Sequence, residues 1–522
     1  YGDHRDLHLS IRRQRQMCIR DRYIRGKRLK LDKAIKYFCS FLLGLGLYQS
    51  GFSDAGSNPN LLNDLHSRLN PSLVDSIHYP KSTLDVLRLI KTAKQTNKSI
   101  SISGGQHSMG GQQYGVGTLH ISMSKMNDVL SFDRNKGIVT VEAGIQWPEL
   151  IDYLIRVQKY SRRQWGITQK QTGADRLSIG GALSSNVHGR GLVLQPMVQD
   201  VESFRLVNAK GKVLNVSRTE NSELFSLVIG GYGLFGVITE VDVRLTPRQK
   251  IVRVVEVINL EDFPEKTAQR IADGYLYGDL QFKTDGSAKD FLKKGVYSFY
   301  KPVPPETLIP EQQGEISGGK WKDLIVLAHS DKAQVFDEYT NYYLSTDGQI
   351  YWTDTHQLGY YDENYESFLA KNLAGYKPGS LMISEVYVPR EKIYDFMDDL
   401  SEANKTQNLD IIYGTIRLIK TDNETFLPWA KKDYACIVLN LRVEHTEDGI
   451  EKGKSDFRLL IDVALSHGGS YFLTYHKWAR KDQLLEAYPQ FPRFLKLKLK
   501  YDPEEMFQSD WYRFYKEMFS EN

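Results

Sequence analysis

Glycine-rich segments that contain histidine stand out in the first half of the 522-residue chain. The first is SISGGQHSMGGQQYG at residues 101–115, and the second is RLSIGGALSSNVHGRGL at residues 176–192. A third segment, GGYGLFG at residues 230–236, has the same character without a histidine. Glycine lets backbone N–H groups approach an anion with no Cβ in the way, and phosphate is the usual anion. The three segments therefore predict one extended nucleotide-type ligand that lies across all of them.

Strands and helices must hold these glycine-rich segments in place, and the residue patterns around the segments predict where those elements lie. DSIHYP at 75–80 alternates and ends at a proline, which predicts a short strand. KSTLDVLRLIKTAKQTN at 81–97 predicts a helix, with Ser82 three residues before Asp85 as in a capping box. KSISIS at 98–103 predicts the strand that leads into Gly104 and Gly105. The result is a β-α-β unit with a glycine loop at the exit of its second strand.

Two common nucleotide-binding motifs are excluded. No G-x-x-x-x-G-K-[ST] string occurs, so the chain has no P-loop motif. GYGLFG at 231–236 matches G-x-G-x-x-G, but that fingerprint requires a helix after it. VITEVDVRLTP at 237–247 alternates like a strand instead, and SFRLVNAKGKVLNV at 203–216 is typical of a hairpin. The dinucleotide-binding Rossmann interpretation therefore fails on its context.

Composition and charge argue against nucleic acid as a partner. The hydrophobic content of 41% and the charged content of 25% are ordinary for a soluble globular protein, and the length favours two domains. Residues 1–36 hold 12 of the 68 Lys and Arg but only 4 of the 64 Asp and Glu. The remaining residues therefore have 56 basic and 60 acidic side chains, a slightly acidic body with no general affinity for phosphate backbones. The three cysteines are scattered, with neither a disulfide framework nor zinc-ligand spacing, and we expect no metal.

The N-terminal region predicts targeting rather than fold. QRQMCIRDR at 14–22 resembles translated sequencing-adaptor read-through, so residues 1–22 are interpreted as a non-native tail. Residues 23–55 combine a basic flank, the apolar run YFCSFLLGLGLY at 37–48 and a polar exit. This order favours a signal peptide or a short membrane anchor, with membrane association through residues 35–48 and a location outside the cytoplasm. A buried helix in a cytoplasmic protein is the alternative.

The three glycine segments, in this order and spacing, resemble a known cofactor domain. GGQHS, IGGALSSNVHGRG and GGYGLFGVITEVDVRL are similar to segments of the FAD-binding domain of vanillyl-alcohol-oxidase-type flavoproteins, also called the PCMH type. The resemblance runs from about Ser76 to Thr246. It implies an α+β fold in which two subdomains hold an extended FAD. It also implies FAD contacts at Gly104, Gly105, Gln106, His107, Ser108, Met109, Gly180, Gly181, Ser184, Asn186, His188, Gly236 and Ile238.

The same resemblance gives the histidine in the first segment a role. Many members with G-G-x-H-S carry FAD covalently, through the flavin 8α-methyl group and a ring nitrogen of that histidine. Neutral imidazole is a nucleophile, so His107 is the candidate for this bond. A histidine that only hydrogen-bonds FAD is the alternative. A second link through cysteine is excluded, because no cysteine lies between Cys39 and Cys436. His188 is expected to hold its loop near the flavin.

The second half of the chain resembles the substrate side of aldonolactone and alditol oxidases. SEVYVPREKIYDFMDDL at 384–400 is similar to their E-x-x-x-P-R segment, which singles out Glu385. Arg417 falls where sugar oxidases place a substrate-facing arginine, although the glutamate usual two residues earlier is Thr415 here. A structural ion pair is the alternative role for this arginine.

The C-terminal segment adds further candidates. Its YP…F…K…DPEEMFQSDW pattern resembles the end of the aldonolactone and decaprenylphosphoryl-ribose oxidases, where a lysine or histidine lies near the flavin. His476 and Lys477 are the matching residues, and an exposed pair at a helix start is the alternative. Tyr475 joins Glu385 and His476 as a candidate base.

The sequence thus predicts an FAD-dependent oxidoreductase that passes a hydride from a hydroxyl-bearing small molecule to flavin N5. The electron acceptor stays open between O₂, a quinone and a carrier protein. The predicted division is a FAD-binding domain at 70–247, a substrate or cap domain with an antiparallel sheet at 248–467, and a segment at 468–522 that returns to the flavin domain. A MurB-like FAD reductase and a flavin-binding protein without catalysis are the alternatives.

Overall fold

The computed structural model describes residues 58–311, 313, 318–359 and 365–520. The predictions for residues 1–22 and for residues 23–55, including the apolar run at 35–48, lie outside these described residues. Among the helices of the described ranges, none combines the length and the apolar character that crossing a membrane requires.

The described part begins with a two-stranded antiparallel sheet of β1 (Leu61–Leu62) and β2 (Ser72–Leu73), and a small parallel sheet follows. It consists of β3 (Ser76–His78), β5 (Leu119–Ser122) and β4 (Ile100–Ser103) in that order. The helix α2 (Thr83–Gln95) connects β3 and β4, and Ser82 caps it by accepting a hydrogen bond from the backbone N–H of Asp85. The predicted β-α-β unit is confirmed, and β4 ends directly before Gly104.

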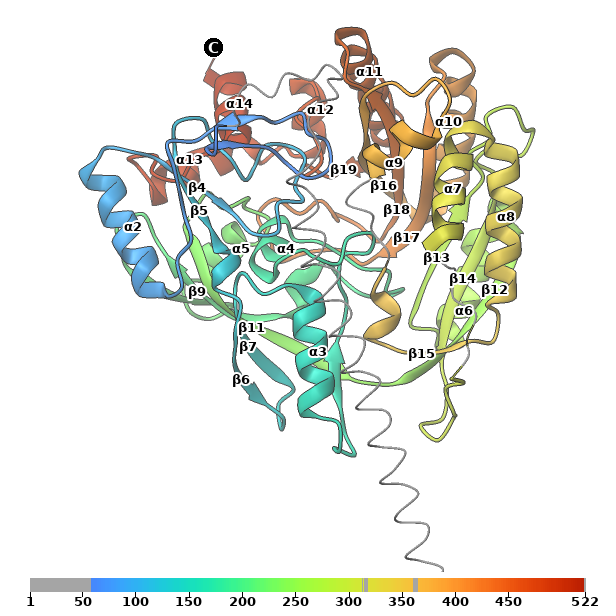
Figure 1. Cartoon of the computed structure of the whole chain (residues 1–522), viewed down its shortest axis with the longest axis horizontal. Helices are drawn as coiled ribbons and strands as arrows, with labels where there is room; N and C mark the ends of the chain where they lie inside the picture. The colour runs from blue at the N-terminus through green and yellow to red at the C-terminus, as the bar shows by residue number, and fades with distance from the viewer. Residues whose placement is uncertain (1–57, 312, 314–317, 360–364, 521–522) are drawn as a thin grey trace, which may run out of the picture. The chain divides into compact units, whose positions relative to one another are not determined.

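The second sheet is antiparallel and follows the order β10-β9-β11-β7-β6, with β8 paired to β11. These strands are β6 (Val129–Asp133), β7 (Ile138–Glu142), β8 (Trp165–Ile167), β9 (Val201–Val207), β10 (Val213–Ser217) and β11 (Val237–Pro247). The helices α3 (Trp147–Val157), α4 (Ile179–Ser185) and α5 (Ser222–Val228) connect them (Figure 1). A strand, not a helix, follows GYGLFG, as its alternation predicts.

An eight-stranded antiparallel sheet forms the other half, in the order β15-β12-β14-β13-β17-β18-β16-β19. Its strands are β12 (Lys250–Asn259), β13 (Tyr277–Phe282), β14 (Lys294–Pro302), β15 (Ile350–Trp352), β16 (Gly379–Pro389), β17 (Ile411–Ile419), β18 (Tyr434–Glu444) and β19 (Ser470–Tyr471). Its helices are α6 (Phe263–Ala272), α7 (Gly318–Ser330), α8 (Lys332–Ser345), α9 (Tyr365–Asn372), α10 (Ile393–Gln407) and α11 (Glu447–Ser466). Figure 1 shows α7 and α8 side by side next to this sheet.

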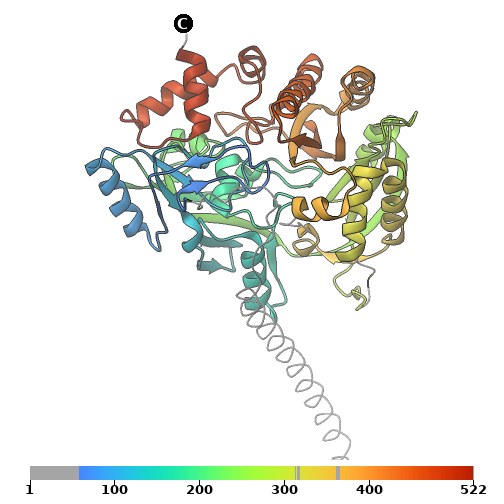
Figure 2. The same ribbon diagram turned by 45° about the horizontal axis from the view of Figure 1, so that its top comes forward.

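The C-terminal helices α12 (Lys481–Ala487), α13 (Phe491–Tyr501) and α14 (Asp510–Ser520) lie beside β4 and β5 in both views (Figures 1 and 2). Backbone hydrogen bonds fix this arrangement, because the N–H of Ile100 donates to Met506 and the N–H of Gln508 donates to the carbonyl of Ile100. A continuous hydrophobic core extends through both halves of the fold. The predicted α+β architecture of a two-subdomain FAD-binding part and an antiparallel cap sheet is confirmed.

Candidate functional site

One cavity of about 500 Å³ touches all three glycine segments and continues to the eight-stranded sheet. Its walls therefore come from both halves of the chain, as expected for a site where a cofactor meets a substrate. Among the residues predicted for the site, those that line it are Gly104, Gly105, Gln106, His107, Ser108, Gly180, Gly181, Ser184, Ile238, Arg417 and Tyr475.

The paired glycines of the first segment allow a close backbone approach. A Cβ at Gly105 would lie 2.3 Å from the carbonyl oxygen of Arg176, and a Cβ at Gly104 would lie 1.9 Å from Ser178 Oγ. Ser178 Oγ in turn accepts the N–H of Gly181 at the start of α4. Only glycine fits here, and the first two segments form one continuous wall. The cavity is lined by the backbone of this wall, and Tyr232 and Gly233 of the third segment line it as well. This lining fits an extended dinucleotide such as FAD.

His107 lies in this wall and contacts a second histidine. Its Nδ1 is 2.8 Å from Nε2 of His66, and both rings line the cavity. Burial lowers the pKa of His66 to about 4. Burial, with a smaller effect of His66, lowers the pKa of His107 to about 3. Both imidazoles are therefore neutral near pH 7, and one proton lies between the facing nitrogens.

Hydrogen bonds on both sides hold the His107 loop. The carboxylate of Asp64 accepts the N–H groups of His66 and Ser67, which fixes the turn that carries His66. The side chain of Gln112 accepts the N–H of Gly110 and donates to the carbonyl of Thr474 at 2.7 Å. The His107 loop is thus tied directly to the segment that carries Tyr475.

Other predicted cofactor residues lie behind the cavity wall. Asn186 ends α4 in the left-handed conformation, and its side chain donates to Asp422 and accepts the N–H of Val198. Gly236 has a φ of +151°, and a Cβ there would lie 2.7 Å from the carbonyl of Val207. The side chain of Met109 is buried in the core. These residues, as the structure places them, shape the loops and do not line the cavity.

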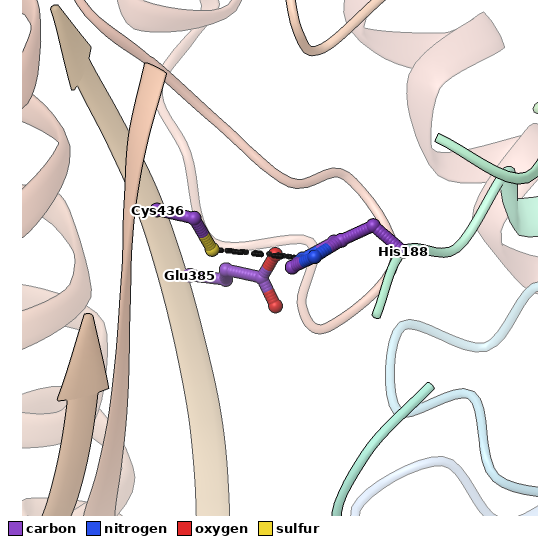
Figure 3. Close-up of side chains that lie close together, drawn as sticks. All are labelled: His188, Glu385 and Cys436. Atoms are coloured by element: carbon purple, nitrogen blue, oxygen red, sulfur yellow. Dashed lines mark hydrogen bonds and ion pairs between the residues drawn. The ribbon is translucent and has the colours of Figure 1, made fainter. Parts of the chain in front are cut away.

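Glu385 is the centre of a buried hydrogen-bond cluster next to the cavity (Figure 3). Its carboxylate faces His188 Nε2 at 2.6 Å and accepts the hydroxyl of Tyr387 at 2.6 Å, the hydroxyl of Tyr475 at 3.1 Å and the thiol of Cys436 at 3.3 Å. Burial alone would raise the pKa of Glu385, but His188 and these donors lower it to about 2. The carboxylate is therefore ionised, and Tyr475 connects it to the cavity.

The hydrogen bonds also assign the protonation of His188. Its Nδ1 is 2.8 Å from the carbonyl oxygen of Gly189, which can only accept, so Nδ1 carries a proton. Its Nε2 lies 2.6 Å from the Glu385 carboxyl group, so one proton is held between the two groups. His188 and Glu385 together therefore carry no net charge. His188 is fully buried and does not line the cavity, because this pair holds it behind the wall.

His188, Glu385 and Cys436 are residue types that also ligate metals, and their ligand atoms lie within 4.8 Å of one another. The 2.6 Å separation of nitrogen and oxygen is that of a direct hydrogen bond. Burial beside Glu385 raises the pKa of the Cys436 thiol, whereas a metal requires the thiolate. We therefore interpret the cluster as a hydrogen-bond network.

Arg417 presents a buried cation to the cavity, and its charge also acts on the nearby Glu385. Its side chain is 7% exposed, and its Nε and Nη1 atoms have no hydrogen-bond partner among the described residues. Strand register places it on the same face of the sheet as Glu385: Arg417 is opposite Cys436, and Glu385 and Thr415 are both opposite Val438. A buried guanidinium whose donors lack hydrogen-bond acceptors is costly, so this geometry favours a ligand oxygen as its partner over a structural ion pair.

The two remaining candidates lie away from the cavity. His476 is 2% exposed and packs between the rings of Phe457, Tyr471 and Trp478, which lowers its pKa by burial to about 3. The alternative of an exposed pair at a helix start is therefore wrong for this histidine. Lys477 is partly buried near the ring of Phe514, and neither residue lines the cavity.

Sequence reasoning missed several residues of the wall. His66 precedes the first motif, and no pattern around it indicates a site. Gln171, which donates to Tyr475 at 3.2 Å, lies in an irregular segment. Apolar residues of α7 and α8 also line the cavity, and their helical spacing was a signal that could have been read.

Two family models match the chain. A FAD binding domain matches residues 74–217, and a D-arabinono-1,4-lactone oxidase matches residues 348–515. The first covers the glycine segments at residues 104–111 and 180–191, and the second covers Glu385, Arg417 and Tyr475. The fold and the site therefore define a flavoprotein with FAD as its cofactor.

The chain is similar to several oxidases and dehydrogenases. The chain is 31% identical to L-gulonolactone oxidase of Mus musculus over 33% of this chain and 37% of the relative. It is 28% identical to the mitochondrial L-galactono-1,4-lactone dehydrogenase of Arabidopsis thaliana over 38% and 32% of the two chains. Cytokinin dehydrogenase 5 of Oryza sativa subsp. japonica is 22% identical over 83% and 85%.

Residues 74–217 match a FAD binding domain, and the chain is similar in this part to FAD-linked oxidases and dehydrogenases. It matches only about a third to a half of the length of the relatives with 28% or higher identity. What this chain oxidises is therefore argued from its own residues below.

Replacing Gly105 by Ala tests the cofactor wall. The new Cβ would lie 2.3 Å from a backbone oxygen, so the two segments must separate. We expect FAD binding to weaken at least about tenfold, because each displaced backbone donor loses a phosphate contact. FAD bound per protein after gel filtration is the measurement. Gly286→Ala is the matched control, since its Cβ meets only the flexible end of Asn404 at 3.3 Å. Equal FAD content in both variants would contradict the assignment.

Proposed function

We propose that this protein is an FAD-dependent oxidoreductase that oxidises a hydroxyl-bearing small molecule at the carbon that carries the hydroxyl. The single observation that carries the proposal is the meeting of the glycine wall with Arg417 and Tyr475 in one cavity. FAD supplies the hydride acceptor, flavin N5, when it is bound. The residues of this chain must then bind the substrate oxygen and remove its proton.

Arg417 and Tyr475 are the polar groups proposed to contact that oxygen. The Arg417 guanidinium stabilises negative charge as the hydroxyl proton leaves, because its buried Nε and Nη1 have no other partner among the described residues. Burial beside Glu385 raises the pKa of Tyr475 well above its ordinary value, so its phenol keeps its proton and donates it to Glu385. The Tyr475 oxygen accepts the substrate proton while its own proton shifts toward Glu385. Glu385 is thus a positioning residue, held by His188.

His107 is the proposed site of the covalent bond to FAD. Its ring is neutral, lies in the cofactor wall and is oriented by His66. A neutral imidazole has a lone pair on one nitrogen, with which His107 would replace one hydrogen of the flavin 8α-methyl group. That methyl hydrogen would leave as a proton, the electron pair of its C–H bond would be taken up by the FAD and pass to the electron acceptor, and the imidazole proton would leave through the other nitrogen. His66 is positioned to receive that proton.

The alternatives receive less support. A MurB-like reductase does not need a covalent flavin. It also does not account for the match of residues 348–515 to a lactone oxidase. A flavin-binding protein without catalysis would not need a buried arginine beside a tyrosine–carboxylate pair. Both alternatives predict that no alcohol reduces the flavin.

Flavin fluorescence on a denaturing gel tests the covalent bond. The purified full chain should keep its yellow colour in an acid-precipitated pellet, and His107→Ala should release FAD into the supernatant. His78→Ala, a histidine of β3 outside the cavity wall, should keep the colour in the pellet. Free FAD from the unmodified protein would leave His107 a binding residue and favour the reductase. Colourless protein that takes up no FAD would overturn the cofactor assignment itself.

Single-turnover reduction of the flavin tests the two polar contacts. Tyr475→Phe and Arg417→Met should each slow reduction by about 10²-fold or more with unchanged FAD content, because proton transfer and charge stabilisation contribute on that scale. Tyr471→Phe is the matched control, since that buried hydroxyl has no partner among the described residues and lies outside the cavity wall. If all three variants reduced at the same rate, neither contact would belong to the reaction.

We further propose that residues 23–55 export or anchor the protein, with the apolar run at 35–48 at the membrane. The support is the order of a basic flank, an apolar run and a polar exit. The full chain should sediment with membranes, and deletion of residues 35–48 should move it to the soluble fraction. Full chain found wholly in the soluble cytoplasmic fraction would contradict the proposal.

A further inference from the structure

Part of the cavity lies between α7, α8 and the eight-stranded sheet, and we call this part the apolar arm. We propose that the apolar arm binds the hydrophobic body of the substrate. The substrate is then an alcohol with an aliphatic or aromatic body, in contrast to a free sugar, polyol or aldonolactone. This inference rests on the proposed function, because it assigns the substrate class of the same site.

The two helices present apolar stripes to the arm. On α7 the lining residues are spaced i, i+3, i+4 and i+7, and on α8 they are spaced i, i+1, i+4 and i+8. Such spacing puts side chains on one face of a helix. The lining residues are Trp321, Leu324, Ile325 and Ala328 of α7, and Val335, Phe336, Tyr339 and Tyr343 of α8.

The apolar face of α8 is only partly covered, although the helix packs against α7, β12 and β14. No residue of α8 is fully buried, although this face carries a valine, a phenylalanine and two tyrosines. The charged residues of the helix, Lys332, Asp337 and Glu338, do not line the cavity. An apolar face that is left accessible inside a cavity, rather than against the core, gains free energy when an apolar ligand covers it.

The sheet side of the arm also contributes apolar side chains. Phe282, Leu381, Ile383, Ile412 and Val438 line it, and the polar side chains of Gln281, Thr284, Tyr413 and Asn440 lie among them. Glu366 also lines the cavity, but its carboxylate already accepts Arg442 and the hydroxyl of Tyr376.

A polyol carries a hydroxyl on every carbon, and each hydroxyl that enters an apolar wall loses its hydrogen bonds to water. An alcohol with a single hydroxyl can place that hydroxyl beside Arg417 and Tyr475 and its hydrophobic body in the apolar arm. None of its hydroxyl groups then lies against the apolar wall. The wall chemistry therefore selects an apolar alcohol.

Titration of the full-length FAD-bound protein under anaerobic conditions tests this inference. The probes are geraniol, xylitol and L-gulono-1,4-lactone, and the readouts are perturbation of the flavin spectrum for binding and bleaching for reduction. We expect geraniol to bind at least tenfold more tightly than the other two. Ala328→Trp, which fills the arm, should remove this preference, and Val335→Asp, which makes it polar, should do the same if the tryptophan variant does not fold. Ala333→Trp, on the exposed side of α8, should keep the preference.

The outcomes separate the two proposals. Equal or tighter binding of xylitol or the lactone, no saturable response to geraniol, or equal effects of Ala328→Trp and Ala333→Trp would each overturn the apolar arm. Bleaching by xylitol or the lactone alone would overturn the arm and support the oxidation. Tight geraniol binding that Ala328→Trp abolishes, with no bleaching by any probe, would support the arm and overturn the oxidation.

Discussion

The close approach of two backbone segments, Gly104–Gly105 against residues 176–178, is the constraint on which the site depends. Here a carbonyl and a serine hydroxyl occupy the positions that two Cβ atoms would need. This contact joins the parallel sheet to α4 and so creates the cofactor wall. The loop that leaves it carries His107, and Gln112 ties that loop to the segment of Tyr475. The packing of two glycines thus determines where a nucleophile, a cofactor and a substrate can meet.

Charge in the buried site is arranged in two separate parts. His188 and Glu385 neutralise each other behind the wall, and the hydroxyl of Tyr475 is the group through which this pair reaches the cavity. Arg417 lies on the same face of the sheet as Glu385. Its Nε and Nη1 atoms donate no hydrogen bond to any of the described residues. The cavity wall is largely apolar and contains the cations of Arg68 and Arg417, an arrangement that suits a reaction in which negative charge develops on one oxygen.

Local patterns in the sequence predicted the elements that carry the cofactor. The strand before Gly104, the cap at Ser82 and the strand after GYGLFG all follow from short-range rules of alternation and capping. Residues 188, 385 and 436 could not be brought together by any such rule, because their contact depends on the pairing of β16 with β18 and on the packing of the two halves. His476 was predicted near the flavin, with an exposed position as the alternative, and only the three aromatic rings around it show that it is enclosed.

Strand register gives the sheet one more property. Glu385 and Thr415 are both opposite Val438, so they lie on one rung, two strand spacings or about 10 Å apart. Every position on such a rung points to the same face, whichever strand supplies it. An acidic group can therefore be lost from one strand and retained on another without any change in the path of the backbone. In evolutionary terms, substitutions at positions on this face of the sheet can alter substrate preference while the backbone of the sheet stays the same. The FAD-binding half of the protein needs no change.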